Sequence, residues 1–184
     1  APDCDVNNNP QNRVIGVRSY SDDPYVVARN SSFAIKGYLS QGLMCCAKHF
    51  PGHGDTGVDS HIGLPVIEKS LEELENVELV PFRSAIEAGV PSIMTSHIVF
   101  PKIDDSGLPS TMNKTIITGI LRERLGFDGL VFTDCLEMGA IKQNWGTVNG
   151  ALMAFKAGVD IACISHTPSL ACEACDIAFE SVDD

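Results

Sequence analysis

The sequence has few positive charges and no long hydrophobic run, and each shortage argues against a class of protein. It holds 13 Lys and Arg against 24 Asp and Glu, which gives a formal net charge of −11. Nucleic-acid binding proteins need a cationic surface to displace the counterions of the phosphates, so this balance argues against that class. No stretch approaches the ~18 consecutive apolar residues of a membrane span. We therefore expect no nucleic-acid partner and no membrane partner.

Disulfide bonds are not expected either, although the chain has seven cysteines. The number is odd, and four of the cysteines lie inside apolar, strand-like runs where a disulfide framework would be awkward. Reduced thiols that fill the core are the better interpretation, and they favour a cytoplasmic location. Cys172 and Cys175 have the C-x-x-C spacing of some metal and redox sites. No second pair accompanies them, so we predict two ordinary helical cysteines.

The chain has the composition of a globular protein and alternating secondary-structure signals. Hydrophobic residues make up 44% and charged residues 20%, which is a balance that can bury a core. Short apolar runs typical of buried parallel strands alternate with amphipathic patterns typical of helices. The predicted strands span 43–47, 92–96, 129–133 and 160–164. The predicted helices span 24–39, 71–88, 113–125 and 147–157, and the last two are followed by glycines that favour a helix end.

The β-α-β-α order predicts an α/β fold, either a Rossmann-like sheet or a (β/α) barrel of the TIM type. A further strand is expected at or just before Ala1, which makes about five strands. A complete eight-stranded barrel needs at least ~200 residues. The chain has 184 residues and no initiator methionine. If it is a barrel, we expect an incomplete one whose first strands are missing, with residues 1–184 forming a single domain.

The segment 48–61 carries the densest group of reactive side chains in the sequence. It holds three His, two Asp and one Lys within fourteen residues, just past the end of a predicted strand. Ligands bind at that edge of the sheet in α/β proteins. Three glycines and a proline shape the loop so that backbone can approach a ligand closely. This pattern predicts a functional loop rather than solvated surface.

Two further features are candidates for chemistry. Asp134 follows an apolar strand directly, where a carboxylate is held in position, although a strand-end Asp is as often a helix cap as a catalyst. Arg18 follows a short apolar run after an Asn- and Pro-rich turn. Its guanidinium suits sugar hydroxyls or a carboxylate equally well, so Arg18 alone leaves a binding role and a salt bridge open.

Three separate motifs resemble those of the β-N-acetylglucosaminidase branch of glycoside hydrolase family 3, and they occur in the same order along the chain as in that family. The longest is KHFPGHGDT at 48–56, followed by DSH at 59–61 and LP at 64–65. DVN at 5–7 with IGVRS at 15–19 resembles the stretch that precedes this signature. FTD at 132–134 with LEM at 136–138 resembles the segment that bears the nucleophile. The resemblance extends to about His166 and implies a catalytic (β/α) barrel domain.

The resemblance implies a retaining, exo-acting glycoside hydrolase that releases N-acetylglucosamine through a covalent glycosyl-enzyme intermediate. By the same resemblance, Asp134 is the nucleophile, and His61, hydrogen-bonded to Asp59, is the general acid and then the base. An imidazole with a pKa near about 6.5 can give and take a proton around neutrality. The residues implied in sugar binding are Arg18, Lys48 and His49. The expected partner is a small carbohydrate with a terminal N-acetylglucosamine, and no cofactor or metal ion is expected.

Rival interpretations remain at this point. A metal-dependent hydrolase could use His and Asp ligands of the 48–61 loop, namely His49, His53, Asp55, Asp59 and His61. The spacing is loose, however, and the sequence has no H-E-x-x-H pair. A non-catalytic fragment is another possibility. Within the same fold, a β-glucosidase and a phosphorylase are closer alternatives. The resemblance argues against the β-glucosidase, because the Asp59–His61 pair belongs to the N-acetylglucosaminidase branch. The phosphorylase stays open, because a His acid does not repel an incoming phosphate as a carboxylate would.

Overall fold

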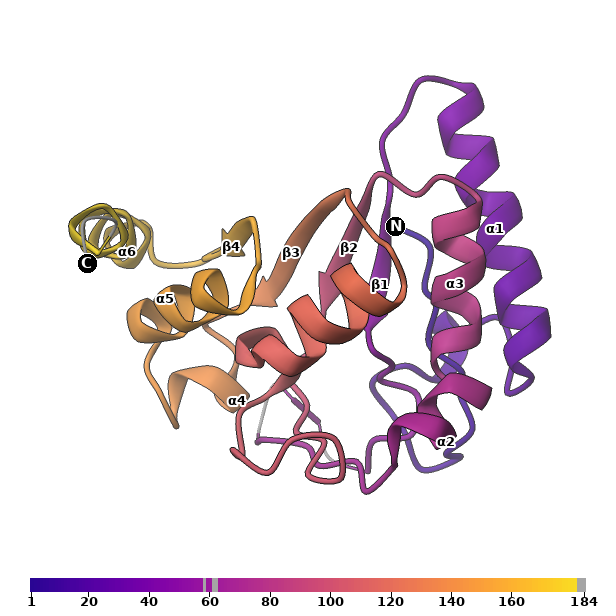
Figure 1. The fold of residues 1–184 in the computed structure, drawn as a ribbon, viewed down its shortest axis with the longest axis horizontal. Helices are drawn as coiled ribbons and strands as arrows, with labels where there is room; N and C mark the ends of the chain where they lie inside the picture. Colours follow the sequence, from indigo (N-terminus) through magenta and orange to yellow (C-terminus); the bar gives the residue numbers. More distant parts are fainter. Residues whose placement is uncertain (58, 61–62, 182–184) are drawn as a thin grey trace.

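A parallel sheet of four strands lies at the centre of the computed structural model, which describes residues 1–57, 59–60 and 63–181 (Figure 1). The strands lie side by side in chain order, as β1 (Cys46–Phe50), β2 (Ser92–Thr95), β3 (Leu130–Cys135) and β4 (Ile161–Cys163). Every neighbouring pair is parallel. All four carboxyl ends therefore lie at one edge of the sheet, as the predicted parallel strands require.

Helices connect the strands. They are α1 (Pro24–Ser40), α2 (Leu71–Asn76), α3 (Leu79–Glu87), α4 (Gly139–Lys142), α5 (Thr147–Ala157) and α6 (Pro168–Glu180), with the short 3-10 helices η1 (Gly16–Arg18) and η2 (Ser110–Met112) and the π-helix η3 (Thr115–Arg124). Helices α1 and α3 pack together near β1, and α5 and α6 pack together near β4 (Figure 1). The α/β class and the alternation of strands and helices are thus confirmed, and the sheet of the described residues is open rather than closed into a barrel.

The strand expected at or just before Ala1 is smaller than predicted, and the strand predicted over 43–47 is displaced along the chain. At the amino end, a single bridge pairs Asp3 with Lys48, so the expected fifth strand is reduced to that contact within the described residues. Strand β1 begins three residues later than predicted, because the exposed residues Leu43 and Met44 form the connection from α1. Its pairing with β2 continues to Phe50, so Lys48 and His49 belong to the strand rather than to the loop beyond it.

The helix predicted over 71–88 is two helices. The first begins at Leu71, as predicted, and the side chains of Ser70 and Glu73 form a capping box before it. The chain then breaks at Val77 and Glu78, and Glu78 is fully buried with its carboxylate 2.6 Å from the Lys69 Nζ. The helix predicted over 113–125 is the π-helix η3. The helix 147–157 has the predicted bounds, and Gly158, at φ 106°, ends it.

The hydrophobic core lies between the sheet and the helices that cover it. Phe50 of β1 and Phe82 of α3 meet edge to face, with ring centroids 5.2 Å apart. Each fully buried side chain of this size stabilises the fold by about 1.5–3 kcal/mol. Other members of this cluster come from β2, β3 and η3, and they include Ile93, Ile117, Leu121 and Val131. This packing fixes the ends of β1 and β3, which carry the candidate catalytic residues.

All seven cysteines are free thiols, as predicted, and Cys4 and Cys45 are buried. In the described part of the chain, none of the helices combines the length and the apolar character that crossing a bilayer would require.

Candidate active site

Asp134 lies on β3, one residue before its carboxyl end. One carboxylate oxygen, Oδ1, accepts a hydrogen bond of 2.7 Å from the backbone N–H of Cys135. The other, Oδ2, lies 4.0 Å from the Nε2 atom of His49 on β1. The side chain is 26% exposed, so a ligand can reach it. The carboxylate thus points toward the 48–61 segment. This agrees with the predicted parallel strands, whose carboxyl ends lie at the same edge of the sheet.

His49 is held in place by a buried carboxylate that the sequence analysis did not single out for a role. The Nδ1 atom of His49 lies 2.6 Å from the Oδ2 of Asp5, and the Asp5 side chain also accepts the backbone N–H groups of His49 and His53. Because a carboxylate can only accept, the Nδ1–H of His49 donates. Its Nε2 atom is then an acceptor that faces Arg18 and Asp134.

Arg18 ends the short helix η1 and reaches the same place. Its Nη2 atom lies 3.4 Å from the Nε2 of His49 and 3.5 Å from the Oδ2 of Asp3. The side chain is 42% exposed, so its remaining donors can contact a ligand. The structure therefore brings together three of the six predicted site residues, Arg18, His49 and Asp134.

The other predicted residues lie around this group. Lys48 precedes His49 on β1, and its backbone carbonyl accepts the N–H of Cys4 at 2.6 Å. Asp59 lines a cavity of about 580 Å³ next to Asn12 and Thr56. His61 lies outside the described residues, so its role and its hydrogen bond with Asp59 stay predictions.

The loop after β1 is fixed by side chains from the amino-terminal segment. Asn12 donates to the carbonyls of His53 and Gly54 at 2.7 and 3.0 Å. A Cβ atom at Gly54 would lie 1.7 Å from the carbonyl oxygen of Val6, so only glycine fits there. Residues 53–54 of the glycine-rich loop are therefore packed closely against the segment 5–12.

The side chains proposed as metal ligands in the rival interpretation are mostly committed elsewhere. Both ring nitrogens of His53 have hydroxyl partners, Thr56 at 2.9 Å and Ser60 at 3.0 Å. Asp55 forms an ion pair of 2.7 Å with Lys69. Among the described residues of the 48–61 segment, only His49 belongs to a group of side chains that could hold a metal ion. The other members of that group are Asp3 and Asp5.

His97, just past β2, is a second positioning residue that sequence reasoning missed. It is 1% exposed, and its Nε2–H donates to the carbonyl oxygen of Cys135 at 3.1 Å. Its Nδ1 atom lies 2.9 Å from the hydroxyl of Thr111. These contacts hold the peptide unit next to Asp134. Its position directly after a predicted strand, in the same place as Asp134 on β3, was the available signal.

Burial sets the protonation of the histidines. It lowers the pKa of His49 and that of His97 to about 4, and it also lowers the pKa of His53. At neutral pH the imidazole of His49 is therefore uncharged. It therefore does not form a fixed ion pair with Asp134.

Burial acts in the opposite direction on the carboxyl groups. It raises the pKa of Asp3 to about 7, with a further contribution from the neighbouring carboxylate of Asp5. Burial also raises the pKa of Asp5, and the hydrogen bonds from His53 and His49 oppose that shift. A buried acid with a pKa near neutrality lies next to Arg18, so the charge beside Arg18 and His49 depends on pH.

The first prediction concerns Asp3→Asn and the pH dependence of stability. Between about pH 4 and 7 the folded protein holds a proton on Asp3 that the unfolded chain has released, so the free energy of unfolding falls as pH rises. The amide never ionises. The variant is therefore expected to gain stability relative to the wild type across this range, by on the order of a few kcal/mol.

Urea unfolding of both proteins at several pH values measures this difference. Burial of the histidines acts with the opposite sign in both proteins, and His49 contributes to the difference as well, because the Asp3 carboxylate raises its pKa. The exposed residue Asp105 supplies a control for the chemical change, because Asp105→Asn makes the same substitution outside the buried cluster. A difference between Asp3→Asn and the wild type that is the same at every pH would mean that Asp3 titrates in the folded protein as it does in the unfolded chain.

Comparison with known proteins agrees with this geometry. The Glycosyl hydrolase family 3 N terminal domain matches residues 1–182. Beta-hexosaminidase A of Pseudoalteromonas piscicida is 42% identical over 173 residues, which are 88% of this chain and 29% of that protein. A beta-hexosaminidase of Thiobacillus denitrificans is 38% identical over 87% of this chain and 44% of its own length. The chain thus spans less than half of these relatives.

Solved structures give the same result. The structure of a glycoside hydrolase family 3 beta-N-acetylglucosaminidase from Paenibacillus sp. str. FPU-7 is 46% identical, with a TM-score of 0.97 over 100% of this chain and 35% of that chain. Beta-glucoside phosphorylase BglX is 26% identical, with a TM-score of 0.91 over 98% of this chain and 34% of that chain. The chain therefore belongs to glycosyl hydrolase family 3.

Proposed function

We propose that this chain carries the catalytic residues of a retaining β-N-acetylglucosaminidase, and that residues 1–184 belong to one catalytic (β/α) barrel domain. The observation that carries the proposal is the convergence of Asp134, His49 and Arg18 at the carboxyl edge of the sheet, with the 4.0 Å approach of His49 to the Asp134 carboxylate. The similarity to proteins named beta-hexosaminidase and beta-N-acetylglucosaminidase supports the choice of sugar.

In the first half of the proposed reaction, a carboxylate oxygen of Asp134 attacks the anomeric carbon of a terminal N-acetylglucosamine. The bond to the leaving oxygen breaks, and His61 donates a proton to that oxygen. A covalent glycosyl ester on Asp134 results. The Cys135 N–H, which donates to Oδ1, orients the carboxylate and leaves Oδ2 toward the side where His49 lies.

In the second half, His61 accepts a proton from water as the water oxygen attacks the same carbon. The ester bond to Asp134 breaks, and the sugar leaves with its original anomeric configuration. Asp59 is proposed to orient the imidazole of His61 and to stabilise its charged form. Arg18, Lys48 and the uncharged His49 are proposed to bind the hydroxyl and acetamido groups of the sugar, with Asp5 fixing the ring of His49.

A direct assay with matched aryl glycosides tests this proposal. We expect release of 4-nitrophenol from the β-N-acetylglucosaminide at a kcat/KM at least about 10²-fold above that for the β-glucoside, because a site that binds the acetamido group leaves polar groups unpaired without it. Because the relatives are longer, the assay uses the full polypeptide that contains this chain. Preference for the glucoside would assign a different substrate.

Phosphorolysis is separated from hydrolysis by the product. The likeness to a beta-glucoside phosphorylase makes this comparison necessary. Adding inorganic phosphate should leave the rate unchanged and give free N-acetylglucosamine. A sugar 1-phosphate as the main product would mean that phosphate, rather than water, attacks the glycosyl ester on Asp134.

A further inference from the structure

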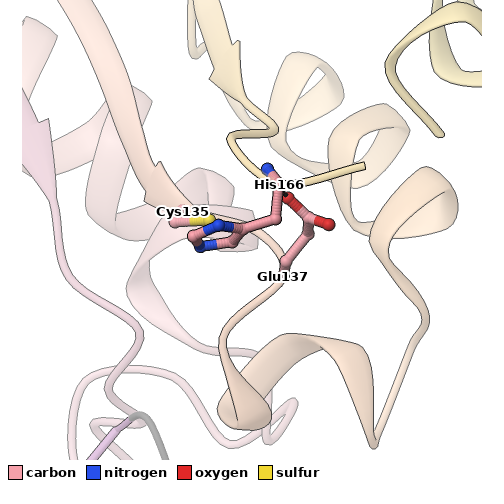
Figure 2. A group of neighbouring side chains, drawn as sticks. All are labelled: Cys135, Glu137 and His166. Atoms are coloured by element: carbon pink, nitrogen blue, oxygen red, sulfur yellow. Dashed lines mark hydrogen bonds between the residues drawn. The ribbon is translucent and has the colours of Figure 1, made fainter. Parts of the chain in front are cut away.

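Three side chains that the proposed reaction does not use converge at the carboxyl ends of β3 and β4. Cys135 is the last residue of β3, Glu137 follows two residues later, and His166 comes three residues after β4. One ligand-type atom from each, the Cys135 sulfur, a Glu137 carboxylate oxygen and a His166 ring nitrogen, lies within 4.8 Å of the others. Figure 2 shows the imidazole of His166 beside the thiol of Cys135.

Backbone contacts hold the two loops in this arrangement. The Oε2 atom of Glu137 accepts the N–H groups of Ser165 at 2.9 Å and His166 at 2.6 Å, which ties the loop after β3 to the loop after β4. Cys135 is itself paired with Cys163 in the parallel register of β3 and β4. These contacts hold the backbone segments that carry the three side chains next to one another.

The chemistry of these three groups is that of a zinc-type cation. A thiolate, an imidazole and a carboxylate are ligands of Zn²⁺, whereas Mg²⁺ and Ca²⁺ prefer oxygen atoms alone. Three protein ligands leave the fourth tetrahedral position for water or another ligand. Cys135 and Glu137 are half-buried and His166 is exposed, so an ion can enter from solvent.

A second group of ligand-type side chains, Asp3, Asp5 and His49, differs from the first in being fully buried. Asp5 accepts two backbone N–H groups and the Nδ1–H of His49, and it is buried together with Asp3 and His49, so this group is closed to an ion from solvent. That group is therefore a hydrogen-bonded support for the sugar-facing residues. The group of Cys135, Glu137 and His166 is open to solvent and includes a soft thiol.

We propose that Cys135, Glu137 and His166 bind one divalent cation of the zinc type. The ion replaces the thiol proton of Cys135, which goes to solvent, and forms bonds to the sulfur, to a ring nitrogen of His166 and to an oxygen of Glu137. Because Cys135 follows Asp134 directly and its N–H donates to the Asp134 carboxylate, the ion lies next to the proposed nucleophile. The binding itself does not depend on the proposed glycosidase reaction.

Metal titration of the protein tests this site. We expect one equivalent of Co²⁺ to produce the near-ultraviolet charge-transfer band of a cobalt–thiolate bond, and Zn²⁺ to displace it. Cys135→Ser should eliminate this band, and His166→Ala should weaken the affinity for Zn²⁺ at least about 10-fold. Circular dichroism of each variant checks that the fold is retained, as the partial exposure of both side chains leads us to expect.

The two exposed cysteines of α6 supply the matched control. The double variant Cys172→Ser/Cys175→Ser removes two thiols at C-x-x-C spacing and should bind Co²⁺ with the same band as the wild type. If the band survives Cys135→Ser, or disappears in the double variant, the metal binds elsewhere and the proposal is wrong. Zn²⁺ affinity that is equal in His166→Ala and the wild type would also overturn it.

Discussion

Asp134→Asn is expected to reduce hydrolysis of the β-N-acetylglucosaminide by at least about 10⁴-fold, because an amide of the same shape cannot form the glycosyl ester. The backbone N–H of Cys135 can still donate to the amide oxygen that replaces Oδ1, so the local structure should survive. Steady-state rates together with thermal unfolding measure the two effects separately. The change should appear in kcat with little loss of stability.

The control for this variant is Asp128→Asn, an exposed carboxylate in the turn before β3. This variant makes the same carboxylate-to-amide change close to Asp134 in sequence, and it should keep the wild-type rate. If Asp134→Asn also keeps a near-native rate, the Asp134 carboxylate serves only to accept the backbone N–H of Cys135, and the nucleophile is another residue.

His61→Ala is expected to have an effect that depends on the leaving group. If His61 protonates the departing oxygen, its loss should slow glycosides with basic alcohol leaving groups by about 10²- to 10⁴-fold. Aryl glycosides with acidic phenols need little protonation to depart, so their first step should be affected far less. A series of aryl glycosides with phenols of graded acidity measures this as a steeper dependence of kcat/KM on leaving-group pKa.

Asp59→Ala is the companion variant. It leaves the imidazole of His61 but removes its proposed orienting partner, so it should show the same dependence on leaving group with a smaller slope. Equal losses for all leaving groups in His61→Ala would give that residue a binding or structural role. His53 and Asp55 would be the next acids to test, although both already have close partners in the loop, at Thr56 and Lys69.

The parts of the fold that could be predicted depend on local signals. The helix 147–157 has its predicted bounds because a left-handed glycine, Gly158, ends it, and glycine is visible in the sequence. Strands β2 and β3 lie within one or two residues of their predicted ranges because they are short apolar runs between turn residues. Strand β3 carries Asp134 at the carboxyl edge of the sheet, so the location of Asp134 in the site was predictable as well.

The parts that could not be predicted depend on partners distant in sequence. Glu78 interrupts a helix because its carboxylate is buried against Lys69 and Asn8, and no local signal marks that break. The strand β1 extends through Lys48 and His49 because β2 offers a pairing partner as far as Thr95. A polar Lys-His pair is not typical of a buried strand, so periodicity alone ended the strand too early.

The residues that support the site could not be predicted from the sequence for a related reason. Asp5 lies 44 residues before His49, and nothing near it in sequence indicates that its side chain orients that ring. His97 acts on the carbonyl of Cys135 from 38 residues away. Motif resemblance identified the residues proposed to bind the sugar, whereas contacts across the sheet were needed to find those that hold them.

The most direct test of the central claim is covalent trapping of the nucleophile. A 5-fluoro-N-acetylglucosaminyl fluoride should react quickly in the first step and slowly in the second, because the added fluorine destabilises the oxocarbenium-like transition states while the fluoride leaving group aids the first. Peptide mapping by mass spectrometry is expected to locate the sugar on Asp134. Recovery of the label on Glu137 or on any other residue, with Asp134 unmodified, would contradict the account.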